Sequence, residues 1–334
     1  MLKIGIAGMG GMGWFHAARY AKLPGADLVA MADIDADKMH AEHAAQINVE
    51  DAEQRFDPEK VRRYDSAEAL IGDPELDVVD ICLPTYLHAD AAVAALDAGH
   101  HVFCEKPMAL TVEASDRMIE AAVRADRKLM IGQCIRFWPE YVYLKQLIEE
   151  GTYGLLRSLT MWRIGGRPGW TRRNWFLDPE LSGGPLLDLH IHDVDYVNYV
   201  LGRPDRLDVT ARAFEDADRF DAIHACFDYH DGPQVHMRAG WAPMQIPFES
   251  GFEAWFDRAV LRYASGELQR FTGPDAVESD VPPYETGDGY LNELAYFLGC
   301  VEAGTDPIRC SPASTRDSVA LVQEEVAHIS ARLR

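Results

Sequence analysis

The chain has 334 residues, of which 32 are Lys or Arg and 54 are Asp or Glu, so its formal net charge is −22. At roughly 150 residues per domain, this length predicts two domains. A hydrophobic content of 48% with 26% charged residues excludes a disordered or fibrous protein. The negative charge argues against a nucleic-acid partner, which needs a concentrated basic face, and against docking on anionic membranes.

The sequence carries no signature of a membrane or secreted protein. No apolar run approaches the roughly 20 residues that span a bilayer, and the opening segment MLKIGIAG lacks the basic-then-apolar layout of a secretory signal. The six cysteines are scattered and include no CxxC pair. We therefore expect free, mostly buried thiols in a reducing compartment, and hence a cytoplasmic protein, rather than a disulfide or zinc framework.

The first third of the chain alternates short apolar runs with amphipathic stretches, which is typical of a parallel sheet covered by helices on both faces. Strands are expected over residues 2–7, 27–32, 78–83, 101–104 and 128–132. Helices are expected over 14–23, 36–46, 89–99 and 112–126. The polar stretch 47–65 is expected to be an excursion within one crossover.

The pattern changes after about residue 133. Helices are expected over 140–150, 186–201, 290–303 and 315–333, and strands over 155–164, 207–213, 223–229, 234–241, 249–256, 260–264 and 267–271. His230-Asp231-Gly232-Pro233 and Ser265-Gly266 have the composition of hairpin turns. The expected fold is therefore an α/β Rossmann domain over residues 1–132, followed by an α+β domain over 133–334 with a large, mostly antiparallel sheet. Where the last helix packs is left open.

A glycine motif follows the first expected strand and opens the first expected helix. It reads GMGGMG, from Gly8 to Gly13, and so has the form GxGxxG. Gly8 suits a tight turn, Gly10 allows the backbone to approach a pyrophosphate, and Gly13 lets helix and strand pack closely. Gly11 and Met12 lie at the helix N-terminus, whose free N–H groups attract phosphate. The motif predicts dinucleotide binding.

An acidic residue follows at the spacing that dinucleotide binding requires. Asp33 lies twenty positions beyond Gly13, at the end of the second expected strand, where a carboxylate would hold the ribose hydroxyls of NAD. The alternative is that Asp33 caps the helix beginning near Ala36. Ile34 follows it, and no arginine stands beside it to neutralise a 2′-phosphate. We therefore expect NAD in preference to NADP.

Two later stretches carry a family resemblance. Glu105-Lys106-Pro107 follows the strand expected over 101–104, at the carboxyl edge where ligands bind, and residues 183–195 read GGPLLDLHIHDVD. Together with GMGGMG, with LPTYLH at 83–88 and with IRFWPEY at 135–141, these stretches resemble the glucose–fructose oxidoreductase / inositol dehydrogenase / rhizopine-catabolism family (Gfo/Idh/MocA). The resemblance extends over nearly the whole chain.

The resemblance implies a Rossmann domain and an α+β domain whose open sheet commonly forms subunit contacts, and hence a homodimer or homotetramer. The implied activity is NAD(P)-dependent oxidation of a secondary hydroxyl on a sugar, inositol or related polyol. By the family's pattern, Lys106, Asp188 and His192 form the catalytic set. The implied cofactor contacts outside the glycine motif are Pro84, His88, Glu105 and Lys106.

The same residues suit this chemistry physically. Removing a hydride from a C–H bond requires the hydroxyl proton to leave, so the site needs a base, and His192 has an ordinary pKa of about 6.5. Asp188, four positions earlier, would share its helix face and hold the imidazole or a second hydroxyl. Lys106 would act as base if its pKa were lowered, or stay charged and stabilise the alkoxide. We favour His192 as proton acceptor; the alternative is that Asp188 caps the helix and His192 is a core residue.

Two residues depart from the family pattern. Pro185 stands where a third glycine is usual, which a helix start tolerates. His190 stands where glycine is frequent, so its ring is expected to contact a substrate hydroxyl or to change the accepted substrate. Asp188, His190 and His192 resemble a metal cluster, but alternate residues of a helix point to nearly opposite sides, so no metal is expected.

The loop over residues 167–175, RPGWTRRNW, is the other candidate for substrate contact. Trp175 would stack on a sugar ring, and the arginines would hold hydroxyls; an ordinary solvated loop is the alternative. Arg136 either faces the pocket or forms a surface salt bridge.

Two other functions fit the same scaffold. One is a non-catalytic dinucleotide-binding sensor or co-regulator, against which the presence of Lys106, Asp188 and His192 argues. The other is a different reaction, such as imine reduction or dihydrodiol oxidation.

Overall fold

The computed structural model describes residues 1–40, 60–169, 172–214, 220–273 and 279–333. They form two compact units: unit 1 comprises Met1–Cys134 and Gly289–Val319, and unit 2 comprises Ile135–Asp288 and Ala320–Arg334. The sequence predicted one cut after residue 132, whereas the segment from 289 to 319 returns to unit 1. Aromatic packing holds it there, since the ring of Tyr290 meets that of Phe15 edge-on at 4.7 Å.

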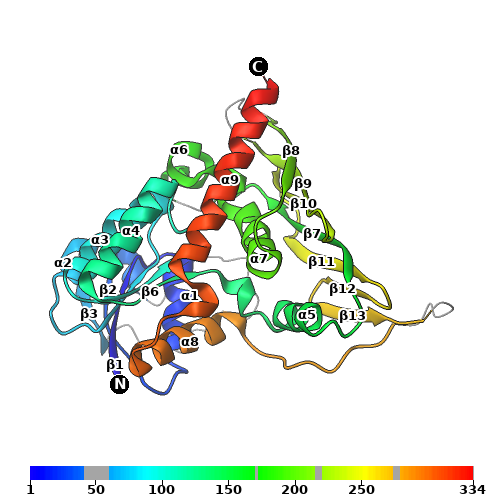
Figure 1. The fold of residues 1–334 in the computed structure, drawn as a ribbon. Coiled ribbons are helices and arrows are strands. Elements are labelled where there is room, and N and C mark those ends of the chain that lie inside the picture. Colours follow the sequence, from blue (N-terminus) through cyan, green and yellow to red (C-terminus); the bar gives the residue numbers. More distant parts are fainter. Residues whose placement is uncertain (41–59, 170–171, 215–219, 274–278, 334) are drawn as a thin grey trace. The chain divides into compact units, whose positions relative to one another are not determined.

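Unit 1 is built on a six-stranded sheet in the order β3-β2-β1-β4-β5-β6 (Figure 1), and all its pairings are parallel. The reversal of strand order at β1 is that of a doubly wound dinucleotide-binding fold. All five expected strands are confirmed. The strands are β1 (Leu2–Ala7), β2 (Ala26–Ala32), β3 (Arg62–Tyr64), β4 (Val78–Ile81), β5 (His101–Glu105) and β6 (Leu129–Gly132).

The sequence missed the edge of this sheet. The third strand, β3, reads Arg-Arg-Tyr, with both arginines exposed, and so lacks the apolar run that marked the other strands. The short helix after it, α2 (Ala67–Ile71), was not expected either. The helix expected over 36–46 begins as a short 3₁₀ turn, Ala36–Met39, and the rest of it, with residues 47–59 of the excursion, lies outside the described residues.

Helices cover both faces of the sheet in unit 1 (Figure 1). Val102 and Cys104 of β5 belong to a buried cluster with residues of α3 and α4. Phe103 points to the opposite face, where its ring lies 5.7 Å from that of Phe297 in α8. The principal helices are α1 (Gly11–Tyr20), α3 (His88–Asp97), α4 (Val112–Ala125) and α8 (Gly289–Ala303). Alternate residues of one buried strand thus contact two different helical layers.

Unit 2 contains a seven-stranded sheet in the order β13-β12-β11-β7-β10-β9-β8. Only the pairing of β10 with β7 is parallel, so the expectation of a mostly antiparallel sheet is confirmed. The hairpin at Ser265 and Gly266 is also present, with positive φ angles of 51° and 80°. The strands are β7 (Leu156–Gly166), β8 (Arg206–Arg212), β9 (Ala222–Asp228), β10 (Gln234–Ala242), β11 (Glu249–Phe256), β12 (Val260–Ala264) and β13 (Glu267–Phe271).

Helices pack on one face of this sheet. Tyr141 of α5 (Pro139–Glu150) contacts Tyr196 of α7 (Ile191–Leu201) at 5.0 Å and Phe252 of β11 at 5.1 Å between ring centroids. The opposite face is open, and Trp255 is 53% exposed on it. The helix expected over 186–201 differs in its first turn, because Leu186–His190 is a π-helix. Such turns occur frequently at functional sites.

The last helix, α9 (Pro312–Leu333), belongs to both units. Its beginning packs in unit 1, where Arg316 Nε lies 2.9 Å from Asp116 Oδ1. Its end packs in unit 2, where Arg332 Nη1 lies 2.6 Å from Asp208 Oδ1. Neither α9 nor any other helix in the described parts of the chain is both long enough and apolar enough to cross a membrane.

Candidate functional site

The glycine motif forms a closely packed turn between β1 and α1. Gly8 has a φ of +99°, and a Cβ on it would lie 2.5 Å from the backbone oxygen of Cys82. A Cβ on Gly13 would lie 2.0 Å from the backbone oxygen of Gly8. Neither position therefore accepts a larger residue without a shift of the backbone.

The middle of the motif is open. Gly10 is the N-cap of α1, and a Cβ placed on it would have no described atom within 4 Å. Gly11 and Met12 follow in the first turn and are partly exposed. The N–H groups of a first helical turn have no acceptor within the helix, and they carry its partial positive charge. This open, electropositive position fits the pyrophosphate of a dinucleotide.

Asp33 lies beside the motif, directly after β2. Its Oδ2 accepts the backbone N–H of Met9 at 3.0 Å, and its Oδ1 accepts that of Asp35 at 2.9 Å. The Nζ of Lys38 lies 3.6 Å from Oδ2. Asp33 therefore joins the glycine turn to the end of β2, while Ile34 beside it is 78% exposed. The alternative of a helix cap is not met in that form, because the N-cap of the turn Ala36–Met39 is Asp35, and Asp33 bonds the backbone N–H of that residue instead.

The loops after β4 and β5 carry the next candidate residues. His88 is buried, with Nδ1 lying 2.8 Å from the oxygen of Pro107 and Nε2 lying 2.7 Å from that of Leu83. Its imidazole thereby ties together the loops that contain Pro84 and Lys106. His88 thus contacts the backbone of both loops at the carboxyl edge of the sheet, where the cofactor is expected to bind.

The strand β5 ends at Glu105, at the carboxyl edge of the sheet, and Lys106 follows directly. The Oε2 of Glu105 accepts the backbone N–H of Lys106 at 3.0 Å, and its Oε1 lies 3.1 Å from Nε2 of His16. Glu105 is 5% exposed, and Lys106 is partly buried. Sequence reasoning missed His16; its only signal was a polar residue among the apolar positions of the first helix.

In unit 2, Asp188 and His192 lie on either side of a change in helix type. Asp188 belongs to the π-helical turn Leu186–His190, and His192 belongs to the first turn of α7. Asp188 is partly exposed and His192 is 8% exposed. The sequence predicted one continuous α-helix, in which both side chains would share a face. The π-helical turn changes the angle about the helix axis between the two residues.

His190 does not face solvent. Its side chain is fully buried, and its Nε2 lies 3.0 Å from Oε1 of Glu325 in α9. Burial lowers the pKa of His190, but Glu325, followed by Asp193, outweighs it and raises that pKa above its ordinary value. The ion pair occupies Nε2 of His190, and the expectation of a substrate contact stays a prediction.

Arg136 is also buried rather than at the surface. Its Nε lies 2.7 Å from Oδ2 of Asp195, its Nη2 lies 2.6 Å from Oδ1, and both side chains are fully buried. The guanidinium also lies over the ring of Tyr199 at 4.5 Å. The two-point bond and the stacked ring fix Arg136 within unit 2, so the expected salt bridge is present but buried rather than at the surface.

The tryptophan–arginine loop is described only in part. Trp170 and Thr171 lie outside the described residues. Trp175 belongs to the 3₁₀ segment Arg172–Leu177, and its ring stacks on that of Phe176 at 4.1 Å, with 21° between the planes. Trp175 is half-buried and therefore still offers part of its ring.

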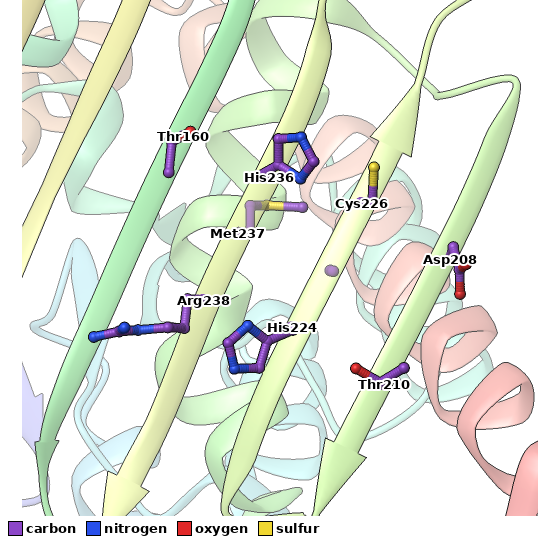
Figure 2. Close-up of a pocket in the computed structure, with 9 residues that line it drawn as sticks. Thr160, Asp208, Thr210, His224, Cys226, His236, Met237 and Arg238 are labelled. Atoms are coloured by element: carbon purple, nitrogen blue, oxygen red, sulfur yellow. The ribbon is translucent and has the colours of Figure 1, made fainter.

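A separate pocket lies on the open face of the sheet in unit 2 (Figure 2). It contains none of the residues assigned above to cofactor, catalysis or substrate. Across it, His236 pairs with Cys226, and Cys226 pairs with Asp208, in neighbouring strands. The lining residues are Thr160, Asp208, Thr210, His224, Ala225, Cys226, His236, Met237 and Arg238.

Comparison with known proteins agrees with these observations. Residues 2–133 match a family model described as the oxidoreductase family with an NAD-binding Rossmann fold. Residues 141–254 match the GFO/IDH/MocA C-terminal domain. The first match covers the whole sheet of unit 1, and the second covers β7 to β10 and most of β11 in unit 2.

Individual relatives are similar over different lengths. Myo-inositol 2-dehydrogenase of Thermotoga maritima is 34% identical over 202 residues, which are 60% of this chain and 55% of that protein. The chain therefore spans about half the length of the first relatives that it matches. Inositol 2-dehydrogenase of Rhizobium meliloti is 26% identical over 322 residues, covering 91% of this chain and 90% of that protein.

The fold has solved counterparts. A levoglucosan dehydrogenase, solved in complex with NADH and levoglucosan, superposes with a TM-score of 0.82 at 21% identity, covering 99% of this chain and 97% of that one. At this identity the likeness concerns the fold. The glycine cradle, the strand order and the two family matches together place the chain in the GFO/IDH/MocA oxidoreductase family.

Proposed function

We propose that this protein is an NAD-dependent dehydrogenase that oxidises a secondary hydroxyl of a sugar, inositol or related polyol. The observation that carries the proposal is the cradle in unit 1, where the open N-cap Gly10 stands at the start of α1 and Asp33 bonds the adjoining Met9. The substrate class follows from the inositol dehydrogenases to which the chain is similar.

The choice of NAD over NADP rests on charge. A 2′-phosphate would bring a second negative group towards the Asp33 carboxylate, which is already bonded to the N–H groups of Met9 and Asp35. Lys38, 3.6 Å from that carboxylate, offsets part of this repulsion. A ribose hydroxyl, by contrast, donates a hydrogen bond to the carboxylate without any charge conflict.

The proposed mechanism assigns one role to each catalytic residue. The nicotinamide of bound NAD supplies the hydride acceptor. His192 accepts the proton of the substrate hydroxyl, since an imidazole titrates near neutral pH. The ammonium of Lys106 stabilises the negative charge that develops on that oxygen. Asp188 orients the imidazole or accepts a second substrate hydroxyl.

Of the remaining candidates, Trp175 keeps the role of substrate contact. Its half-buried ring offers an apolar face of the kind on which sugar rings stack. His190 and Arg136 are assigned to support, since each is fixed in a buried ion pair. They hold the segments on which His192 and Asp195 lie.

We further propose that the protein assembles as a homodimer or homotetramer through the open face of the sheet in unit 2. Trp255, 53% exposed on that face, is the type of large aromatic residue that subunit contacts bury. A cytoplasmic location stays a prediction; all six cysteines are free thiols, as a reducing compartment requires.

The test is NADH formation from NAD with a panel of polyols, including myo-inositol. Lys106→Met should lower kcat by about 10²-fold or more while changing the Kd of NAD less than about threefold. Lys22→Met, at an exposed position just after α1, is the matched control and should retain full turnover. Unchanged turnover in Lys106→Met would remove this lysine from the mechanism. Tight NAD binding without turnover of any polyol would favour a dinucleotide sensor instead.

A further inference from the structure

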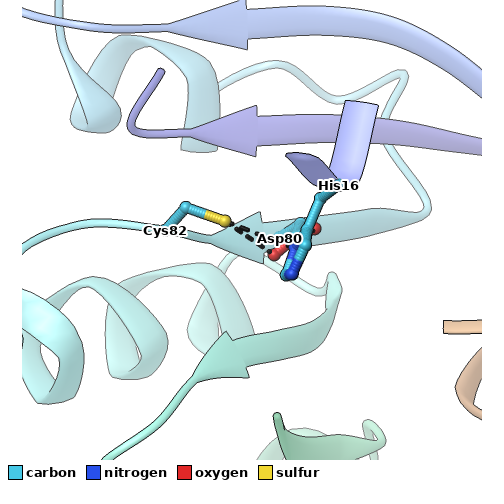
Figure 3. A group of neighbouring side chains, drawn as sticks. All are labelled: His16, Asp80 and Cys82. Carbon is cyan, nitrogen blue, oxygen red and sulfur yellow. Dashed lines mark hydrogen bonds and ion pairs between the residues drawn. The ribbon is translucent and has the colours of Figure 1, made fainter. Parts of the chain in front are cut away.

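The side chains of His16, Asp80 and Cys82 form a cluster in unit 1 (Figure 3). His16, on α1, is fully buried between the strands β4 and β5. Its Nδ1 lies 2.8 Å from Oδ2 of Asp80 on β4, and its Nε2 lies 3.1 Å from Oε1 of Glu105 on β5. The edge of the Phe103 ring closes the site, at 5.6 Å between ring centroids. One imidazole therefore joins helix α1 to the ends of two strands.

Neighbouring groups favour the charged form of this imidazole. Burial lowers the pKa of His16, but Cys82 and Asp80 act against it, and the pKa is raised well above its ordinary value. Burial, followed by Asp80, also raises the pKa of the Cys82 thiol. The Nδ1 of His16 hydrogen-bonds Asp80, whereas its Nε2 lies within ion-pair distance of Glu105 without a hydrogen bond of good geometry. The imidazole thus lies between two carboxylates, one on each side of the ring.

The same imidazole belongs to two groups of potential metal ligands. Two groups in the described parts of the chain bring potential metal ligands within 4.8 Å of one another: His16 with Asp80 and Cys82, and His16 with Glu105 and Glu293. Both depend on the same imidazole, and a metal would need a lone pair on one of its nitrogens. An imidazolium has no such lone pair, so protonation of His16 and metal binding exclude one another.

Glu105 transmits this constraint to the next residue. While its Oε1 is held by His16, its Oε2 accepts the backbone N–H of Lys106 at 3.0 Å. On the neighbouring strand, a Cβ on Gly132 would lie 3.2 Å from the same Oε1, so the strand passes close to this carboxylate. A carboxylate with one oxygen beside His16 and the other on the N–H of Lys106 constrains the backbone from which the Lys106 side chain extends.

We infer that His16 is a positioning residue for Lys106: clamped between Asp80 and Glu105, it fixes the carboxylate that holds the backbone of this lysine. The inference rests on the role proposed for Lys106. It concerns geometry rather than chemistry, because His16 is fully buried and is linked to Lys106 through the carboxylate of Glu105.

His100 supplies a matched control within the same sheet. It precedes β5 at the opposite end from Glu105 and is 3% exposed. Its ring nitrogens lie 2.8 Å from the oxygen of Leu76 and 2.9 Å from that of Ile71. Like His16, it is a buried imidazole with an acceptor at each nitrogen, but it has no link to Lys106 in these contacts.

The experiment compares His16→Gln with His100→Gln in the full chain, by two measurements. The first is hydrogen exchange at the backbone amide of Lys106, which should accelerate by at least about tenfold in His16→Gln only, because Glu105 is released. The second is steady-state kinetics, in which kcat should fall by about tenfold or more in His16→Gln, with the Kd of NAD nearly unchanged. Both variants should lose thermal stability to a similar extent.

Equal exchange at Lys106 in both variants, or equal loss of kcat, would overturn the inference and leave His16 with a purely structural role. So would a stoichiometric metal ion in the purified protein that is lost in His16→Gln. If His16→Gln does not fold, Asp80→Asn, which keeps the volume and an acceptor but removes one charge, should raise exchange in the same direction. The exchange measurement needs no substrate, so an absence of polyol turnover would contradict the proposed function alone.

Discussion

A Cβ on Gly13 would lie 2.0 Å from the backbone oxygen of Gly8, five residues earlier in the same motif. At Gly10, between them, a Cβ would have no described atom within 4 Å. The glycines of one motif therefore have different duties. Gly13 is needed by the fold itself, whereas Gly10 leaves room for a ligand.

The substitutions Gly13→Ala and Gly10→Ala should distinguish the structural function of Gly13 from the ligand-binding function of Gly10. Gly13→Ala forces two backbone segments apart and should cost about 1–3 kcal/mol of the free energy of unfolding, measured by urea denaturation without cofactor. Gly10→Ala should leave that free energy within about 0.5 kcal/mol of the original and raise the Kd of NAD by about tenfold or more. A loss of stability in Gly10→Ala without loss of affinity would show that no ligand uses the open space.

Asp33 should decide between the two dinucleotides. In Asp33→Ala the charge-assisted bonds to the ribose hydroxyls are lost, which should weaken NAD binding by about tenfold or more. The affinity for NADP should fall less or rise, because the repulsion of its 2′-phosphate disappears while Lys38 remains. Titration calorimetry with both dinucleotides measures the ratio. Asp37→Asn, an exposed carboxylate four residues on, should leave it unchanged.

The ion pair of His190 with Glu325 should make stability depend on pH. The pKa of His190 is raised in the folded protein, by Glu325 and then Asp193 against the effect of burial. Its contribution is therefore fully present below the unfolded value of about 6.5 and is lost as the pH rises through the folded value. In His190→Gln the free energy of unfolding should fall more at about pH 6 than at about pH 9, by about 1 kcal/mol or more.

The control for this measurement is His230→Gln, which removes an exposed imidazole in the turn between β9 and β10. Its effect on the free energy of unfolding should stay within about 0.5 kcal/mol at both pH values. A pH-independent difference between wild type and His190→Gln would mean that His190 contributes by packing alone.

Arg136 should be among the more sensitive positions of unit 2. Arg136→Met leaves the buried carboxylate of Asp195 without its two-point partner, which should cost about 3–5 kcal/mol in urea unfolding. Adding Asp195→Asn should recover part of that loss, because the stranded charge disappears. Arg203→Ala, which removes a surface pair with Glu324 in which the arginine is 59% exposed, should cost less than about 1 kcal/mol. An equal loss in the free energy of unfolding at the two arginines would contradict the claim that burial makes the Arg136 ion pair more important than the exposed one.

The sequence located the parts of the fold that depend on neighbours along the chain. The buried strands of unit 1 showed as apolar runs, and the hairpin at Ser265 and Gly266 showed as turn composition, because each reflects a local backbone preference. The strand β3 escaped, since Arg62 and Arg63 at the sheet edge need no apolar pattern. The return of the segment from 289 to 319 to unit 1 escaped because it depends on ring contacts such as that of Phe15 with Tyr290.

By itself, the sequence determined the dinucleotide motif, the carboxylate after the second strand and the Glu-Lys-Pro segment, since their positions follow from spacing to a strand end. Only the tertiary structure decided that His16 meets Asp80, 64 residues away, and that His190 meets Glu325, 135 residues away. It likewise placed His190 and Arg136 in buried ion pairs. The physical reason is that spacing along a chain records local geometry, whereas the partner of a buried charge is set by which elements pack together.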